Sequence, residues 1–222
     1  MIPPKQNAEF VAQMEEVLSI YERPHDPSLP VICMDEQPFQ LLEEKRVPIE
    51  ASLNHPKRVD YEYKRAGTAS IFLFAEPLAG WRDARARERR TKVDWAQEVA
   101  RVLDSRYADC EKVILVCDNL NTHTKGAFYA TFNAQKAKAY VDKIQFCYTP
   151  KHGSWLNIAE CELSCLTRQC LKDKRFGNID TLNDGLSAWS HDINSRQRAV
   201  NWQMTVDDAR MKLRSLYPTK VF

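Results

Sequence analysis

Two short apolar segments of this chain each end on an aspartate, and they constrain its fold more than any other feature. Residues 31–36 read VICMDE and contain Asp35, whereas residues 113–119 read VILVCDN and contain Asp118. Runs of this length and composition are typical of buried strands in an α/β protein. If the two strands are neighbours, the carboxylates face each other across one strand spacing, about 5 Å. Functional groups gather at the carboxyl ends of strands in such sheets.

Two ionised carboxylates at that separation repel each other unless a cation lies between them. Magnesium suits the position, because it takes oxygen ligands and keeps several waters. A third carboxylate would permit two metal ions, which together serve phosphoryl transfer. The alternative interpretation is that each aspartate merely ends a strand or begins a turn.

The rest of the chain adds strands early and helices late. Alternation at residues 81–91 predicts a strand with Arg85, Arg87 and Arg89 on one face. Thr91 and Asp94 stand where an N-cap and its partner would begin a helix. Further periodicity predicts strands over 68–77 and 143–149, and helices over 8–22, 91–106, 125–141, 154–172, 181–195 and 205–216. This order indicates an α/β fold whose mixed sheet is antiparallel at first and parallel later.

Composition excludes some classes of protein. The chain has 222 residues, 44% of them hydrophobic, with a net charge of +2, so only local charge clusters are informative. No apolar run approaches the roughly 20 residues of a membrane span, and no secretory leader is evident. The seven cysteines form no CxxC pair, which favours reduced thiols in the cytosol. A zinc site on Cys161 and Cys165 is a weaker alternative, because the spacing lacks the usual knuckle pattern.

The third acid is ambiguous from periodicity alone. The segment YTPKHGSWLNIAE, residues 148–160, leads from a strand into a helix and ends on Glu160. Glu160 and Glu162 lie on opposite shoulders of the apolar stripe of that helix, about equally far from its centre. The polar residues on the same side of the helix as Glu160 slightly favour Glu160 as the third acid. Either glutamate could be an ordinary solvated helix residue.

The motifs VICMDE, VILVCDNLNTH and YTPKHGSWLNIAE resemble the three acidic motifs of the DDE transposases. The resemblance is to the mariner-like superfamily and its bacterial insertion-sequence branch, and it runs through nearly the whole chain. Matched position by position, it implies a catalytic and metal-binding triad of Asp35, Asp118 and Glu160. It also implies a ribonuclease H-like fold, with a mixed five-stranded sheet flanked by helices, and a two-metal site for Mg²⁺ or Mn²⁺.

The resemblance further implies cleavage of DNA at element ends and transfer of the freed 3′-hydroxyl to target DNA. It suggests a homodimer in the DNA complex, a separate or upstream helix-turn-helix domain, and a bacterial, cytoplasmic, nucleoid-associated enzyme with no membrane partner. We expect residues 1–28 to be a linker and helix, 29–175 the catalytic core with an insertion at 37–66, and 176–222 a helical extension.

Some features depart from the family pattern. The gap between Asp118 and Glu160 is longer than usual, Gln37 replaces a more usual small hydroxyl residue, and no helix-turn-helix pattern is found. The chain would then be a catalytic fragment, a split-frame product or a decayed copy. The alternatives to a transposase are a ribonuclease H-like nuclease without strand transfer and an inactive or domesticated DNA-binding relic.

Several residues near the triad are candidate supports. The turn before Glu160 would end the strand at Pro150, bend at Gly153 and cap the helix with Ser154. Lys151 and His152 would face phosphate, and Trp155 would pack under the helix or stack on a base.

Other candidates lie further along the chain. Asn119 and His123 are possible active-site helpers, although His123 could equally be a structural histidine. The basic stripe around Arg85, Arg87 and Arg89 would bind phosphates or protect an edge strand. The pair Lys64 and Arg65, in the insertion, is a further candidate DNA contact.

Overall fold

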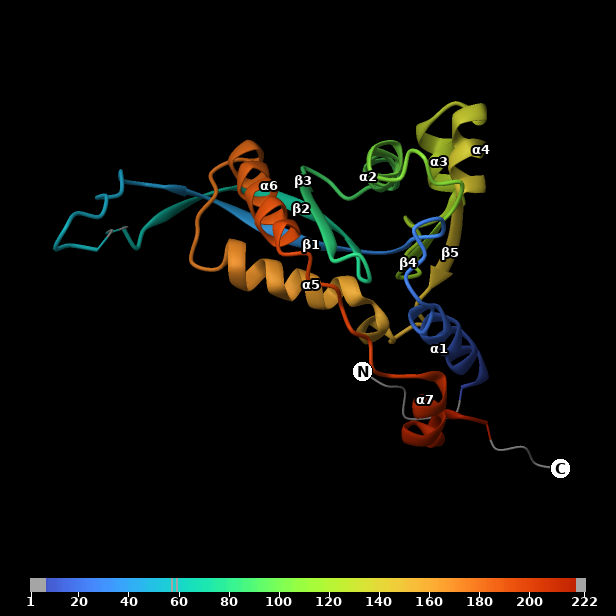
Figure 1. The fold of residues 1–222 in the computed structure, drawn as a ribbon. Coiled ribbons are helices and arrows are strands. Elements are labelled where there is room, and N and C mark those ends of the chain that lie inside the picture. Colours follow the sequence, from blue (N-terminus) through green and yellow to red (C-terminus); the bar gives the residue numbers. More distant parts are fainter. Residues whose placement is uncertain (1–6, 57, 59, 219–222) are drawn as a thin grey trace.

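The computed structural model describes residues 7–56, 58 and 60–218 (Figure 1). Its centre is a five-stranded sheet in the order β3-β2-β1-β4-β5. The strands are β1 Val31–Glu44, β2 Tyr63–Glu76, β3 Trp81–Arg87, β4 Val113–Cys117 and β5 Ile144–Tyr148. The first three pair antiparallel, whereas β1 with β4 and β4 with β5 pair parallel. The expectation of a mixed sheet, antiparallel at first and parallel later, is therefore confirmed.

Helices cover both faces of the sheet. They are α1 Ala8–Tyr21, α2 Lys92–Ser105, α3 Lys125–Thr131, α4 Ala134–Lys143, α5 Ile158–Leu166, α6 Ile179–Ser195 and α7 Val206–Lys212. A 3₁₀ turn, Ser154–Leu156, precedes α5, and a π-helical turn, Thr167–Leu171, follows it; another 3₁₀ turn is Arg214–Leu216. In the described part of the chain, no helix has the length and apolar character to span a membrane.

Two hydrophobic clusters hold the layers together. Ile71 and Leu73 of β2 belong to the cluster under α1, α5 and α6. Phe72 and Phe74, which alternate with them, belong to the cluster under α2, α3 and α4. Because successive side chains of a strand point to opposite faces, a strand covered on both sides must be apolar throughout. This is why the central segments read as continuous hydrophobic runs.

The first strand is longer than the sequence pattern indicates. We predicted a short strand ending near Asp35 and a polar insertion or loop over 37–66. Instead, β1 continues to Glu44 and β2 begins at Tyr63, so both ends of that range are strand (Figure 1). This outer part of the hairpin is exposed or half-buried except at Leu41, and only a few of its apolar side chains, Phe39, Leu41 and Ala66, contact the core. That apolar pattern is too short to identify a strand from the sequence.

One predicted helix is divided in the structure, and one predicted helix cap is present. The single helix over 125–141 is two helices, because Phe132 and Asn133 are extended and the Asn133 side chain accepts a hydrogen bond from the Lys136 amide. The capping box of Thr91 and Asp94 at the start of α2 is present as predicted. All seven cysteines are free thiols.

Candidate active site

Asp35 and Asp118 lie at the point where two parallel strands separate. The ladder between β1 and β4 ends with Cys33 opposite Val116. Asp35 lies two residues after Cys33, and Asp118 lies two residues after Val116. The two aspartates therefore occupy matching positions on neighbouring strands. Beyond this point β1 bends away and pairs only with β2, where Asp35 lies opposite Leu73. The expected adjacency of the two strands is confirmed.

The two glutamates of α5 have opposite environments. Glu162 is 7% exposed and receives two hydrogen bonds from the Arg82 guanidinium, at 2.7 and 3.0 Å. Glu160 is exposed and, with Asp35, lines an open cleft of about 400 Å³. The structure therefore brings Asp35 and Glu160 to one cleft and places Glu162 inside the fold.

The surroundings of Asp35 disfavour its charged form. Burial, together with the charges of Asp118 and Glu160, raises the pKa of Asp35 to about 6, although a hydrogen bond from the Glu36 amide and the charge of His123 act in the opposite direction. A carboxyl group near like charges favours its neutral form unless a cation is bound. His123 offsets only part of the negative charge at this site.

Asp118 is held by a histidine. His123 is 1% exposed and stacks on Trp95 with ring centroids 5.1 Å apart. Its Nδ1 lies 2.5 Å from Asp118 Oδ1, and its Nε2 lies 3.1 Å from Glu36 Oε1. Burial acts to lower the pKa of His123, but hydrogen bonds to Asp118, Cys117 and Glu36 raise it to about 11. His123 is therefore a buried cation between two carboxylates.

Sequence reasoning missed Glu36. It directly follows Asp35 in the strand, and the two-residue period turns its side chain to the opposite face, where it meets His123. The only signal was the second acid of the motif VICMDE.

Asn157 links the helix that carries Glu160 to the strand that carries Asp35. Its Oδ1 accepts a hydrogen bond from the Ala159 amide, and its Nδ2 donates one to the Met34 carbonyl at 2.9 Å. Asn157 is thus the N-cap of α5, a role that we predicted for Ser154. Ser154 instead begins the preceding 3₁₀ turn. Sequence reasoning also missed this residue, although asparagine is a favoured N-cap.

The turn before α5 is tight for a different reason from the one expected. The positive φ of 66° belongs to His152, not to Gly153. Gly153 is needed because a Cβ there would lie 2.5 Å from Pro150 Cγ. Lys151 and His152 are exposed on this turn, as is Asn119 after β4. Trp155 is half-buried and packs against the core under α5, which matches the first of its two predicted roles.

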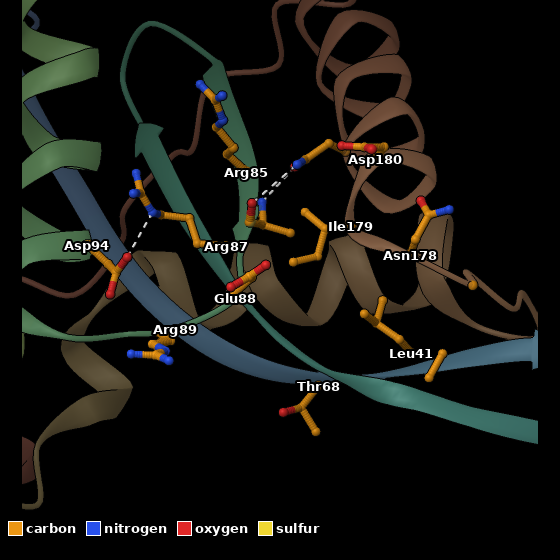
Figure 2. Close-up of a pocket in the computed structure, with 14 residues that line it drawn as sticks. Leu41, Thr68, Arg85, Arg87, Glu88, Arg89, Asp94, Asn178, Ile179 and Asp180 are labelled. Atoms are coloured by element: carbon orange, nitrogen blue, oxygen red, sulfur yellow. Dashed lines mark hydrogen bonds and ion pairs between the residues drawn. The ribbon is translucent and has the colours of Figure 1, made fainter.

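Of the three arginines in the predicted basic stripe, Arg87 is engaged in ion pairs, whereas Arg85 and Arg89 are exposed. Arg85 and Arg87 share a face as predicted, but β3 ends at Arg87 and Arg89 lies beyond it. Arg87 pairs with Asp94 at 3.1 Å and with Glu98 at 2.9 Å. Figure 2 shows the open groove, about 1090 Å³, that these arginines line together with Glu88, Asp94 and Asp180. Positive and negative charges are mixed along this groove.

The outer edge of β3 is covered by α6. Asn183 accepts a hydrogen bond from the Ala86 amide at 2.7 Å and donates one to the Ala86 carbonyl at 3.2 Å. Asn194 makes the same pair of bonds with the backbone of Arg82, both at 2.8 Å. These two side chains occupy backbone groups with which another strand could otherwise pair. Lys64, on the free part of β2, pairs with Glu43 at 3.1 Å, and its neighbour Arg65 is exposed.

The acidic residues fit a divalent cation chemically. Within the described residues, no three histidine, cysteine or acidic side chains are already gathered closely enough to hold a metal ion. However, the surroundings of Asp35 destabilise its charged form. Oxygen donors of this kind are those that Mg²⁺ and Mn²⁺ prefer. A cation bound by these carboxylates would relieve that penalty.

Known structures share the fold. The chain is similar to the Mos1 mariner paired-end complex with Mn, with a TM-score of 0.55 and 14% identity over 89% of this chain and 61% of that one. It is also similar to a pre-cleavage Mos1 transpososome, with a TM-score of 0.57 and 13% identity over 100% of this chain and 67% of that one. The Mos1 strand transfer complex matches at a TM-score of 0.53 and 14% identity, over 91% of this chain and 66% of that one. The ribonuclease H-like fold is confirmed, and the chain spans about two thirds or less of these transposases' length.

Sequence comparison gives the family. No curated protein matches the chain significantly. The model of the family described as DDE superfamily endonuclease matches residues 30–183, which is more than half of the chain and includes Asp35, Asp118 and Glu160. The protein therefore belongs to the DDE superfamily of endonucleases.

Proposed function

We propose that this chain is the catalytic domain of a DDE transposase, which cuts DNA at element ends and joins the freed 3′-hydroxyl to target DNA. The observation that carries the proposal is that Asp35 and Asp118 follow the point where β1 and β4 separate, and that Glu160 lines the same cleft as Asp35. Unbalanced carboxylates in an open cleft suit a polyanionic substrate only when divalent cations are present. Family membership and the fold shared with Mos1 support the same activity.

Asp35, Asp118 and Glu160 would hold one or two divalent cations. Bound there, Mg²⁺ or Mn²⁺ would activate the attacking oxygen and stabilise the leaving one. Two of the Mos1 paired-end complexes that share this fold are complexes with Mn and with Mg. The cleft that Asp35 and Glu160 line is open to solvent, so a DNA backbone could reach these carboxylates.

Neighbouring residues of the chain keep the carboxylates in position. His123, fixed by Trp95 and Glu36, holds the Asp118 side chain in one orientation. Asn157 joins the start of α5 to β1, so that Glu160 and Asp35 keep a constant relation. These contacts pre-organise the site before the substrate binds. We propose Lys151 and His152, exposed on the adjacent turn, as phosphate contacts, with Arg85 and Arg89 as weaker candidates.

We also propose that the protein acts as a homodimer on DNA. The β1–β2 hairpin projects from the rest of the fold (Figure 1). Its tip carries exposed apolar side chains, among them Val47, 91% exposed, and Tyr61, 85% exposed. Exposed apolar groups clustered on a projecting hairpin are typical of an interaction surface. Light scattering with and without end DNA would test this, and a Val47→Asp, Tyr61→Ser variant should remain monomeric.

The finer parts of the proposal follow from the resemblance of the acidic motifs. We place the enzyme in the bacterial insertion-sequence branch, acting in the cytoplasm on nucleoid DNA with a helix-turn-helix domain supplied separately or upstream. Residues 29–175 would be the catalytic core with its insertion at 37–66, preceded by a linker and helix at 1–28 and followed by a helical extension at 176–222.

The decisive experiment is Mn²⁺-dependent cleavage and joining of a duplex that carries the DNA flanking the gene, with a DNA-reading domain added. The parent chain should cut and join, and the Asp118→Ala variant should do neither. Hydrolysis without joining would instead indicate a nuclease. DNA binding without any cleavage by the parent would indicate an inactive relic.

A further inference from the structure

The cleft that contains Asp35 and Glu160 has a second end with a different character. Asp35 and Glu160 are the acids at one end, and Glu36 lines the cleft beside Asp35, although its side chain is turned to His123. The remaining lining residues are Gln37, Leu163, Ser164, Thr167 and Arg168. Within the described part of the chain, Arg168 is the only cationic side chain that lines this cleft.

Arg168 is not balanced by a neighbouring acid. Its guanidinium contacts Cys165 Sγ at 3.4 Å, and among the described residues no carboxylate pairs with it. The sequence explains why, since the helical neighbours three and four positions away are Ser164, Cys165, Leu171 and Lys172. Other arginines on this fold do pair with acids, as Arg82 does with Glu162 and Arg175 with Glu44. An exposed, unpaired guanidinium that faces a catalytic cleft is available to an anionic ligand.

The local backbone keeps Arg168 on the side of Glu160. Glu160, Ser164, Thr167 and Arg168 follow one another at helical spacing and are all exposed. At Thr167 the α-helix changes to a π-helical turn, in which the Lys172 amide bonds the Thr167 carbonyl at 2.7 Å. Single π turns inside helices occur frequently at functional sites. The Gln37 side-chain amide lies 3.3 Å from Thr167 Oγ1 and braces this turn against β1.

Distance along the helix separates the two ends. Eight residues at a rise of about 1.5 Å each place Arg168 roughly 12 Å beyond Glu160. That is too far for the guanidinium to contact the phosphate that is cut, but suitable for another phosphate of the same strand. The planar fork of arginine binds phosphate oxygens with two hydrogen bonds.

We propose that Arg168, assisted by Thr167 and Gln37, binds a DNA phosphate near the one that is cut and so sets the register of the strand in the cleft. The inference rests on the proposed function, because it takes the ligand of this cleft to be DNA. It adds a substrate contact on the helix side of the site, opposite the strand that carries Asp35.

The first test measures affinity as a function of salt. Fluorescence anisotropy would follow binding of a labelled duplex with the gene-flanking end, in the Asp118→Ala background that does not cut the probe. Arg168→Ala should raise Kd roughly tenfold and lower the slope of log K against log salt by about 0.9. Arg168→Lys should restore the slope. Arg196→Ala, which removes an exposed arginine from the end of α6, is the matched control and should leave both quantities nearly unchanged.

The second test locates the phosphate. Replacing single phosphates of the probe by neutral methylphosphonates should reveal one position, near the cleavage site, at which Arg168→Ala no longer weakens binding. Three outcomes would overturn the inference. They are an unchanged salt slope in Arg168→Ala, a weakening of binding by Arg168→Ala that is equal at every methylphosphonate position, and no binding of the probe. Cleavage by the parent is scored separately. A located contact without cleavage would therefore refute the proposed function alone, and cleavage without a located contact would refute this inference alone.

Discussion

Two regions of the molecule are dense in charge, and they differ in whether that charge is balanced. Around β3, Arg82 pairs with Glu162, and Arg87 pairs with both Asp94 and Glu98. At the ends of β1 and β4, Asp35 and Asp118 face each other with Glu160 nearby and a single buried cation, His123, beside them. The balanced region joins elements of the fold. The unbalanced region costs stability in the absence of a ligand, which is the property expected of a binding site.

The largest expected effect is that of Glu160→Gln. Because Glu160 is exposed and belongs to the unbalanced region, the substitution should lower the cleavage rate by roughly a thousandfold or more, equivalent to about 4 kcal/mol. The free energy of unfolding should change by less than about 0.5 kcal/mol. Single-turnover cleavage and urea unfolding measure the two quantities.

Glu162→Gln on the same helix is the matched control. It should destabilise the fold and leave the rate of the folded fraction within about tenfold of the parent. If Glu162→Gln removed cleavage while Glu160→Gln retained it, the assignment of the two glutamates would be reversed.

The next largest effect is on stability. Arg82 is 5% exposed, and Arg82→Met leaves Glu162 buried without its partner, which should cost about 3–5 kcal/mol of unfolding free energy. The double variant Arg82→Met, Glu162→Leu should recover most of that loss, because it buries no charge. Denaturant unfolding of the three proteins forms the test. A double variant no more stable than Arg82→Met would show that the pair is not the source of the stability.

The same contrast explains which features could be predicted from the sequence. Apolar runs identified β4 and β5, and the aspartates after two such runs placed the site, since side-chain period and strand polarity are local properties. The choice between Glu160 and Glu162 was not local. It depends on Arg82, 80 positions earlier in the chain, reaching Glu162. Asn157 and His123 were seen in their motifs, but their partners Met34 and Glu36 are determined by tertiary packing.

The outer parts of β1 and β2 were not predicted as strands for a different reason. These parts are stabilised by backbone pairing, by exposed ion pairs such as Lys64 with Glu43, and by only a few apolar side chains such as Phe39 and Leu41, so the hydrophobic pattern is too short to detect. The prediction of Ser154 as the helix cap was wrong because a 3₁₀ turn delays the start of α5 until Asn157.

Metal binding should change the stability of the unbalanced region alone. Mn²⁺ at about one hundred times its Kd should stabilise the parent by about 2.7 kcal/mol, if it does not bind the unfolded chain. For a chain of this size that is a rise in Tm of roughly 5–10 °C. Asp35→Asn should remove this rise in Tm. Without metal, the variant should be at least as stable as the parent, because it relieves repulsion among the carboxylates. Differential scanning calorimetry with and without Mn²⁺ measures both effects. An equal rise in parent and variant would place the cation elsewhere.

A smaller effect is expected at the link between α5 and β1. Asn157→Ala removes the helix cap and the bond to the Met34 carbonyl, and should cost about 1–2 kcal/mol of unfolding free energy. Asn157→Asp keeps the acceptor for the Ala159 amide but loses the donor to Met34. Its cleavage rate, compared with that of Asn157→Ala, would therefore show which bond positions Glu160. Equal stability of the parent and Asn157→Ala would contradict the proposed role.

The smallest effect is expected for Arg85→Ala. Arg85 is exposed in a groove where Glu88 and Asp180 offset the arginines, and among the described residues no carboxylate pairs with it. Its removal should change the free energy of unfolding by less than about 0.5 kcal/mol. Arg87→Ala, two residues away on the same face, should cost more, because it leaves Glu98, 1% exposed, with Arg101 as its remaining ion-pair partner. Denaturant unfolding ranks the two variants, and salt-dependent DNA binding adds the sharper test. If Arg85→Ala lowered the salt slope by about 0.9, as expected for a lost phosphate contact, the groove beside β3 would be a DNA surface despite its mixed charge.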